Sequence, residues 1–223
     1  MIRKTLPVRF AHMTSPSVES YNTLRTNLMY TENLQVIALT STIPNEGKST
    51  TSIQLALSFA KLNKKVLLVD ADLRKGSLRR YLPQREKLVG LSELILGNEE
   101  YVVYDTDIDN FYLLYSGKLP PNPSELLSGN NFKKVIDQLK KQFDYIIIDT
   151  PPMTVAPDAT VIGKVADGTV FVIRNDFVNK SQVKRVKKEF DLNQIRIVGT
   201  VLTRVKKNQV DYANYGYYGH YYK

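Results

Sequence analysis

The sequence predicts an α/β protein whose doubly wound, mainly parallel sheet has helices on both faces. Short apolar runs recur at residues 36–40, 66–70, 111–115, 145–149, 169–173 and 197–202. Each run is rich in β-branched or aromatic residues and lacks strict alternation of apolar and polar side chains, as is typical of strands buried on both faces. Helix-length segments lie between them, and strands that alternate with helices form right-handed crossovers in a parallel sheet.

Helical spacing of apolar residues is found in four segments, at residues 18–29, 49–62, 132–141 and 180–190. The clearest is 49–62, whose apolar residues repeat at intervals of three and four until Asn63 closes the segment. Residues 118–127, KLPPNPSELL, are expected to form a proline-punctuated loop that leads into a further helix, with Ser124 as its N-cap.

The composition fits one domain, expected at residues 1–207, followed by a flexible tyrosine-rich tail at residues 208–223. The 223 residues are 43% hydrophobic, enough for a full core. No run approaches the roughly 18 consecutive apolar residues of a membrane span, so we expect a cytoplasmic protein. The chain has no cysteine and two isolated histidines, His12 and His220, which excludes disulfides and leaves the chemistry to carboxylates, lysine and hydroxyls. A net charge of +9 favours an acidic partner.

The segment 41–51, STIPNEGKSTT, follows a predicted strand and ends like a phosphate-binding P-loop. In such loops the backbone N–H groups and the helix N-terminus surround phosphate oxygens. Lys48 would neutralise the β and γ phosphates, and the Ser49 hydroxyl would ligate Mg²⁺. Thr42 stands where the full pattern has its first glycine. The predicted nucleotide-binding residues are Asn45, Glu46, Gly47, Lys48, Ser49 and Thr50.

Three aspartates end or follow predicted strands, at what should be one edge of the sheet. Asp149 ends the run YIIID, as a Walker B strand that orients magnesium does. Asp70 ends the run VLLVD and is followed by Asp72 and Arg74. Aspartates also commonly end strands by capping the turn that follows, but these occur together with a loop that already calls for magnesium. The combination favours a site for a magnesium nucleotide.

Together these motifs resemble the bacterial tyrosine kinases that act with polysaccharide co-polymerases, in the cytosolic form found in Gram-positive bacteria. The resemblance rests on SYNTLRTNLMY, PNEGKSTT, VLLVDADLRKG, GLSELILG, PPNPSELL, FDYIIIDTPP with Asp158 and Ala159 after it, and a terminal tyrosine cluster. The VDADLR segment looks like the family's Walker A′ element. Because several motifs occur in the right order over nearly the whole chain, the resemblance is specific.

The resemblance implies an ATP-dependent protein-tyrosine kinase with a P-loop NTPase fold of the deviant Walker superfamily, its kinase domain spanning residues 1–207. Lys48 and Ser49 would bind ATP and its Mg²⁺, with Asp72 and Asp149 in the metal shell. Asp70 would accept the tyrosine proton, since a phenol with a pKa of about 10 is mostly protonated at neutral pH. The expected catalytic residues are Lys48, Asp70, Asp72 and Asp149, and the expected metal ligands are Ser49, Asp72 and Asp149.

The last twelve residues, YANYGYYGHYYK, contain six of the fourteen tyrosines of the chain. The resemblance implies that this cluster is autophosphorylated between subunits of a ring. If the last strand ends near residue 202 and is parallel to the others, about sixteen flexible residues extend roughly 50 Å from the nucleotide edge. Six phosphotyrosines would add about nine to twelve negative charges. The expected phosphorylation sites are Tyr212, Tyr215, Tyr217, Tyr218, Tyr221 and Tyr222.

Two positions depart from the pattern that the resemblance implies. Ring assembly in relatives uses a Glu-x-x-Arg-x-x-Arg helix, and the matching helix around residues 18–29 has Glu19, Asn22 and Arg25. Glu19 and Arg25 are therefore the expected oligomerisation residues, and one opposite-charge pair between subunits remains possible. Relatives often carry an asparagine for adenine where this chain has Thr203. A threonine hydroxyl cannot make the two-point contact of an amide.

The resemblance also implies partners. These are a membrane polysaccharide co-polymerase whose cytosolic segment activates the kinase, further copies of the chain in a ring, and a cognate phosphotyrosine phosphatase. The protein would then lie at the inner face of the cell membrane through its partner and regulate capsule or exopolysaccharide production. We expect no nucleic-acid partner.

Two alternative functions remain open from the residues alone. A partition or septum-positioning ATPase of the same superfamily would carry an extra lysine where this chain has Ile43, and its membrane-binding members end in an amphipathic helix that a glycine-interrupted tail does not form. A nucleic-acid-binding or scaffold protein would use basic side chains on the predicted helix at 180–190. Lysines at helical spacing more often form the solvent-exposed face of a helix than a nucleic-acid-binding surface. The lysines in question are Lys180, Lys184, Lys187 and Lys188.

Overall fold

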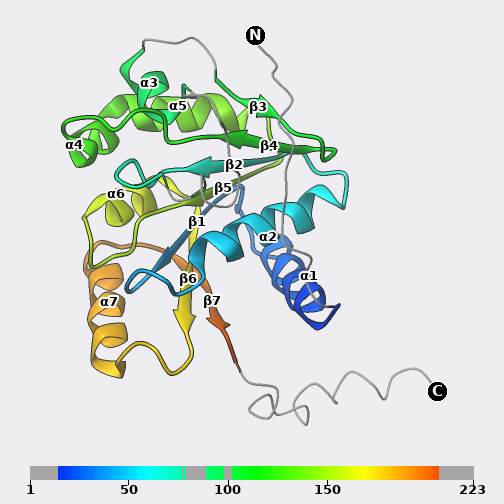
Figure 1. Ribbon diagram of the computed structural model, residues 1–223, viewed down its shortest axis with the longest axis vertical. Helices are drawn as coiled ribbons and strands as arrows, with labels where there is room; N and C mark the ends of the chain where they lie inside the picture. The colour runs from blue at the N-terminus through cyan, green and yellow to red at the C-terminus, as the bar shows by residue number, and fades with distance from the viewer. Residues whose placement is uncertain (1–14, 77, 79–88, 98–101, 206–223) are drawn as a thin grey trace.

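The computed structural model describes residues 15–76, 78, 89–97 and 102–205, with the backbone alone at 15–17. Within these residues, seven strands form one sheet in the order β3-β4-β2-β5-β1-β6-β7 (Figure 1). All neighbouring strands are parallel except β3, which is antiparallel to β4 at one edge. The strands are β1 (Val36–Ser41), β2 (Val66–Asp70), β3 (Tyr104–Asp105), β4 (Phe111–Leu114), β5 (Tyr145–Asp149), β6 (Gly168–Arg174) and β7 (Ile197–Thr203). The predicted α/β fold with a mainly parallel sheet is confirmed.

The described part of the chain has seven helices, of which α1 precedes β1 and the others lie between strands: α1 (Ser15–Met29), α2 (Lys48–Ala60), α3 (Leu91–Leu96), α4 (Pro123–Ser128), α5 (Asn130–Lys140), α6 (Asp158–Val165) and α7 (Lys180–Leu192). Four of them, α1, α2, α5 and α7, match the segments predicted from apolar spacing. Helices α3 and α6 and the two-residue strand β3 were not predicted, because six or eight residues hardly repeat a helical period.

The helix α4 corrects one expectation. It begins at Pro123 with Asn122 at the N-cap, so Ser124 lies inside the first turn and is not the cap. A proline suits the first helical position because its missing N–H would have no partner there and its φ angle is already helical. The Ser124 hydroxyl is instead turned to Asp158 on α6.

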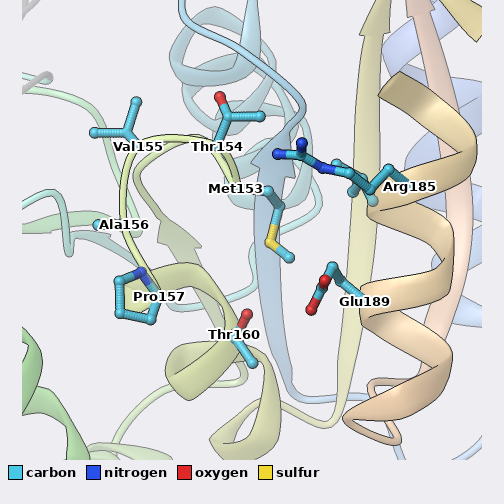
Figure 2. Close-up of a pocket in the computed structure, with 9 residues that line it drawn as sticks. Met153, Thr154, Val155, Ala156, Pro157, Thr160, Arg185 and Glu189 are labelled. Atoms are coloured by element: carbon cyan, nitrogen blue, oxygen red, sulfur yellow. The ribbon is translucent and has the colours of Figure 1, made fainter. Parts of the chain in front are cut away.

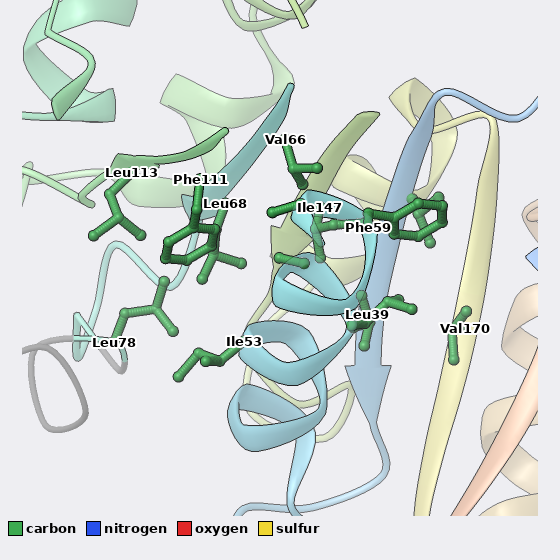
Figure 3. Packing of buried hydrophobic residues seen from close by; sticks show 14 of the residues in the cluster. Leu39, Ile53, Phe59, Val66, Leu68, Leu78, Phe111, Leu113, Ile147 and Val170 are labelled. Atoms are coloured by element: carbon green, nitrogen blue, oxygen red, sulfur yellow. The ribbon is translucent and has the colours of Figure 1, made fainter. Parts of the chain in front are cut away.

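Successive residues of each strand face opposite layers of helices, as a doubly wound sheet requires. Ile37 and Leu39 of β1 pack with Phe59 and Ile53 of α2, in the cluster seen in Figure 3. Val36 and Ala38 pack on the other face with α3, α5 and α6. Helix α7 covers that same face farther along, because Phe171 packs against α7 while its neighbours Val170 and Val172 belong to the α2 side. The central strands are thus buried on both faces, which explains their unbroken apolar runs.

The topology brings the carboxyl ends of β1, β2 and β5 to one edge of the sheet. Asp70, the last residue of β2, is the register partner of Asp149, the last residue of β5. Helix α2 begins at this edge, directly after the loop that follows β1. The P-loop and the strand-end aspartates therefore meet there, as the sequence predicted.

The predicted domain boundary at residue 207 and the tail at 208–223 lie outside the described residues, and so do His12 and His220. The domain boundary and the tail therefore stay predictions. No helix in the described ranges is long and apolar enough to cross a membrane.

At the opposite end of β1, the half-buried Asp167 ties three elements together. Its Oδ2 accepts hydrogen bonds from the backbone N–H groups of Gln35 (3.0 Å) and Val36 (2.7 Å), and its Oδ1 pairs with Lys140 Nζ at 3.0 Å. Burial alone would raise the pKa of Asp167, but the hydrogen bonds from Val36, Lys140 and Gln35 outweigh burial and lower this pKa. The ionised carboxylate therefore stabilises the fold.

We expect Asp167→Asn to lower the free energy of unfolding at pH 7 by about 1–2 kcal/mol, because an amide keeps one acceptor but loses the ion pair. A lowered folded-state pKa gives stability above the unfolded pKa, and this stability is lost as the pH falls through the folded pKa. Urea unfolding at pH 7 and at acidic pH should show the difference between variant and wild type shrinking on acidification. Asp137→Asn on the exposed face of α5 is the control, and an equal loss in both variants would contradict the assignment.

Candidate functional site

The loop after β1 has the backbone of a phosphate-binding loop. Gly47 precedes α2 with φ at 90°, a left-handed conformation that favours glycine. A Cβ atom at this position would also lie 3.3 Å from Thr203 Cγ2. Helix α2 then begins at Lys48 and directs the free N–H groups and the positive end of its dipole at the loop. The loop is therefore shaped to hold an anion.

The buried side chain of Glu46 holds this loop in place. Its Oε1 accepts a hydrogen bond from Ile43 N at 2.7 Å, and its Oε2 accepts one from Arg174 N at 3.0 Å. Its backbone carbonyl accepts a hydrogen bond from Thr203 Oγ1 at 2.7 Å. The Glu46 carboxylate thus links the loop to β6. The Thr203 hydroxyl donates its hydrogen bond to the loop backbone, not to a nucleotide's adenine. Residue type alone did not indicate these supporting roles.

The carboxylate of Asp149 lies at the centre of the site. It is fully buried and accepts hydrogen bonds from Lys48 Nζ (2.8 Å), Ser49 Oγ (2.7 Å) and Ser52 Oγ (2.8 Å). The sequence predicted that Asp149, Lys48 and Ser49 belong to one site, but it did not predict Ser52. The only signal for Ser52 was its position one helical turn after Lys48, on the same face of α2.

The two other predicted aspartates lie next to this cluster. Asp70 is fully buried, and its oxygens accept hydrogen bonds of 3.3 Å from the backbone N–H groups of Asp72 and Leu78. Burial raises the pKa of Asp70 well above its ordinary value, the charges of Asp149 and Asp72 raise it further, and the Leu78 N–H and Lys48 oppose the rise. Asp72 is also buried and accepts a hydrogen bond from Lys75 N at 3.1 Å.

A cavity of about 400 Å³ opens over these groups. Asn45, Gly47, Lys48, Ser49 and Asp72 line it, together with the side chains of Arg74 and Lys75. Asp70 and Asp149 are both fully buried and do not line it themselves. Three cations in one wall suit a polyanion such as a triphosphate.

The oxygen donors at the cavity fit Mg²⁺. The Ser49 hydroxyl and the carboxylates of Asp72 and Asp149 are hard ligands of the kind that Mg²⁺ prefers. Within the described ranges, no three acidic or histidine side chains are close enough to form a cage for a metal. This arrangement suits Mg²⁺, which is usually bound through one or two carboxylates, with water and phosphate oxygens as its other ligands.

A second hollow of about 610 Å³ lies between the β5–α6 connection and α7. Figure 2 shows Met153, Thr154 and Pro157 on one side and Arg185 and Glu189 of α7 on the other. It contains none of the predicted catalytic residues. The lysines of α7 named above are all exposed.

The remaining predicted residues lie elsewhere. Glu19 is exposed on α1, whereas Arg25 is half-buried and turned to α2. Arg25 Nη1 donates hydrogen bonds to the Ser58 carbonyl at 2.9 Å and to Asn22 Oδ1 at 3.1 Å. The six predicted phosphorylation sites (Tyr212, Tyr215, Tyr217, Tyr218, Tyr221 and Tyr222) lie outside the described residues.

Comparison with known proteins gives consistent matches over most of the chain. Residues 34–159 match a family model described as an AAA domain. The chain is 38% identical over 206 residues to tyrosine-protein kinase CpsD of Streptococcus pneumoniae, covering 91% of this chain and 91% of that protein. It is 36% identical over 215 residues to tyrosine-protein kinase YwqD of Bacillus subtilis, covering 93% and 90%. The kinase domain of the Escherichia coli tyrosine kinase ETK matches with a TM-score of 0.80 at 29% identity, covering 92% and 84%.

We expect Thr203→Val to weaken the binding of ADP by about three- to tenfold, because valine keeps the shape of threonine but leaves the Glu46 carbonyl without its donor. Thr203→Ser keeps the hydroxyl and should bind within about twofold of wild type. Titration with a fluorescent ADP analogue measures both. Equal affinities in all three proteins would show that the loop does not depend on this bond.

Proposed function

The chain belongs to the family of bacterial tyrosine-protein kinases, and we propose that it uses ATP and Mg²⁺ to phosphorylate tyrosines of its own C-terminal segment. The observation that carries the proposal is the cluster at the sheet edge. Lys48 Nζ and Ser49 Oγ donate hydrogen bonds of 2.8 and 2.7 Å to the Asp149 carboxylate, and Lys48, Ser49 and Asp72 line the cavity beside it.

In this proposal the phosphates of ATP lie against the backbone of residues 45–50, with Thr50 as the last member of the loop. Lys48 would exchange its contact with Asp149 for one with the phosphates. Ser49, Asp72 and Asp149 would hold Mg²⁺, which supplies charge neutralisation for the phosphates when bound. Positioning and charge neutralisation account for most of the rate in such loose transition states.

Asp70 is the proposed proton acceptor. A bond forms between the tyrosine oxygen and the γ phosphorus as the bond to the β-phosphate oxygen breaks, and the phenol proton passes to Asp70. The position of Asp70 supports this role, since it ends β2 as the register partner of Asp149 and lies two residues before Asp72 at the same sheet edge. Because Asp70 is fully buried and does not line the cavity, proton transfer to it requires a small local opening.

The position of β7 supports the tail as the substrate. Thr203, its last residue, touches the P-loop through Glu46, so the chain leaves the sheet at the rim of the cavity. A fully extended stretch as long as the remaining residues, 204–223, spans up to about 70 Å. They therefore reach the cavity of the same chain or that of a neighbour.

The proposed partners follow from family membership. They are further copies of this chain in a ring, a membrane co-polymerase whose cytosolic segment activates the kinase, and a cognate phosphotyrosine phosphatase. The protein would act at the inner face of the cell membrane through that co-polymerase. The process that it regulates would be capsule or exopolysaccharide production.

We expect Lys48→Met to abolish phosphorylation of the tail, because it removes the cation that the phosphates require. Purified protein incubated with ATP and Mg²⁺ is analysed by mass spectrometry beside a chain that stops at Asn208. Lys61→Met, on the exposed end of α2, is the matched control and should behave as wild type. Phosphotyrosine that persists in Lys48→Met, or that lies mainly outside the tail, would refute the proposal.

Assembly through α1 has its own test. Glu19 is exposed and free to meet a second copy, whereas Arg25 is partly engaged by Ser58, so reversing the charge of Glu19 should disrupt a ring most. We expect Glu19→Lys to reduce the oligomeric fraction in sedimentation velocity. Glu32→Lys, exposed beyond the end of α1, is the control. Unchanged sedimentation of Glu19→Lys would exclude α1 as the interface.

A further inference from the structure

Three residues to which the proposed function gives no role, Arg74, Ser124 and Asp158, meet at the guanidinium of Arg74. Arg74 follows β2 in the VDADLR segment, Ser124 belongs to α4 in PPNPSELL, and Asp158 is the first residue of α6. Arg74 Nε donates to Asp158 Oδ2 at 2.9 Å, and Arg74 Nη2 donates to Ser124 Oγ at 2.9 Å and to Asp158 Oδ1 at 3.4 Å. The Ser124 hydroxyl donates in turn to Asp158 Oδ1.

The burial of these groups shows which of them is the anchor. The Asp158 side chain is 0% exposed, whereas that of Arg74 is 37% exposed. A buried carboxylate requires both charge neutralisation and hydrogen bonds, and Arg74 and Ser124 supply both. Two nitrogens of the guanidinium are therefore fixed by contacts with the two oxygens of a buried carboxylate.

The rest of Arg74 faces the cavity of the catalytic cluster. Arg74 lines the same wall as Lys48, Ser49 and Asp72. Its Nη1 has no hydrogen-bond partner among the residues that the structure describes, while Nε and Nη2 are occupied. The guanidinium of an arginine is protonated at any physiological pH, so the group carries its charge. A cation held at Nε and Nη2, whose Nη1 is unpaired among the described residues, is thus presented to the place where phosphates are expected.

We propose that Arg74 is a catalytic residue that donates a hydrogen bond to the phosphoryl group during its transfer, and that Asp158 and Ser124 are positioning residues that hold Arg74 for this contact. The inference rests on the proposed function, since it requires a nucleotide in this cavity. As the new bond to the tyrosine oxygen forms and the bond to the β-phosphate oxygen breaks, negative charge spreads over the three outer oxygens of the phosphoryl group. Arg74 stabilises that charge without transferring a proton.

The first test compares ligands with and without a mimic of the transferred group. Arg74→Gln should bind Mg-ADP within about twofold of wild type but should bind Mg-ADP with aluminium fluoride about 100-fold more weakly, because only the latter occupies the phosphoryl position. Arg185→Gln, at the second hollow, is the matched control. If Arg74→Gln loses affinity for both ligands equally, or for neither, Arg74 does not act on the transferred group.

The second test asks whether Ser124 acts through Arg74. Ser124→Ala should lower kcat several-fold while leaving the KM for ATP unchanged, and Asp158→Asn should lower kcat further. In an Arg74→Gln background Ser124→Ala should cost nothing more, because residues that act as a unit are not additive. A full additional loss in the double variant would assign Ser124 a separate, structural role.

The two proposals fail in different ways. If the wild-type chain phosphorylates no tyrosine even with the cytosolic segment of its proposed co-polymerase added, the proposed function is wrong, yet the binding measurements with ADP and aluminium fluoride still test Arg74. If the tail is phosphorylated and Arg74→Gln turns over at the wild-type rate, the inference about Arg74 is wrong and the function stands. Asp158→Asn risks unfolding, so its melting temperature is measured first, and Ser124→Ala is the milder variant.

Discussion

The buried charge of Asp149 is the constraint on which the site depends. A carboxylate at the end of a central strand is out of contact with water and would be costly to keep ionised without partners. Lys48, Ser49 and Ser52 supply those partners from a single helix, α2, because positions one turn apart lie on one face. The same contacts hold α2 against the end of β5. The hydrogen bonds to Asp149 therefore both fix the fold of the loop and place Lys48 and Ser49 at the site.

The loop is also fixed from its other side, by strands that contribute no catalytic group. Glu46 joins it to β6 through Arg174, and Thr203 joins it to β7. The β5–α6 connection is bound to it as well, since Thr154 donates to the Thr42 carbonyl from N (3.1 Å) and from Oγ1 (2.8 Å). Thr42, in the place of a glycine, is fully buried there. A loop held on three sides loses little entropy when it binds phosphate.

Much of this was predictable from the sequence, for a physical reason. Central parallel strands must be apolar on both faces, so the runs that end in Asp70 and Asp149 could be predicted as strands. In a parallel sheet the carboxyl ends of both strands then lie at one edge. The GKS triplet between strand and helix added the loop. Short elements carry no such signal, which is why α3, α6 and β3 escaped prediction. Family resemblance, rather than periodicity, suggested the individual roles.

Contacts between distant segments could not be predicted. Arg74 and Asp158 are 84 positions apart in the sequence, and neither segment has a feature that predicts contact with the other. The sequence also gives no sign that the Glu46 carboxylate accepts hydrogen bonds from the backbone of Ile43 and Arg174. The inward turn of Arg25 to Ser58 is of the same kind. Residue type and spacing predict the elements and the edge, but tertiary packing decides where each polar side chain points.

The register of β2 against β5 has a consequence for how this chain tolerates changes in length. Asp70 and Asp149 are direct partners, so deleting or inserting one residue in either strand would send one carboxylate to the opposite face. Such indels would separate the acids while leaving the apolar composition of the strands intact. Homologous chains should therefore vary in length in the connections between strands, and hardly at all within these two.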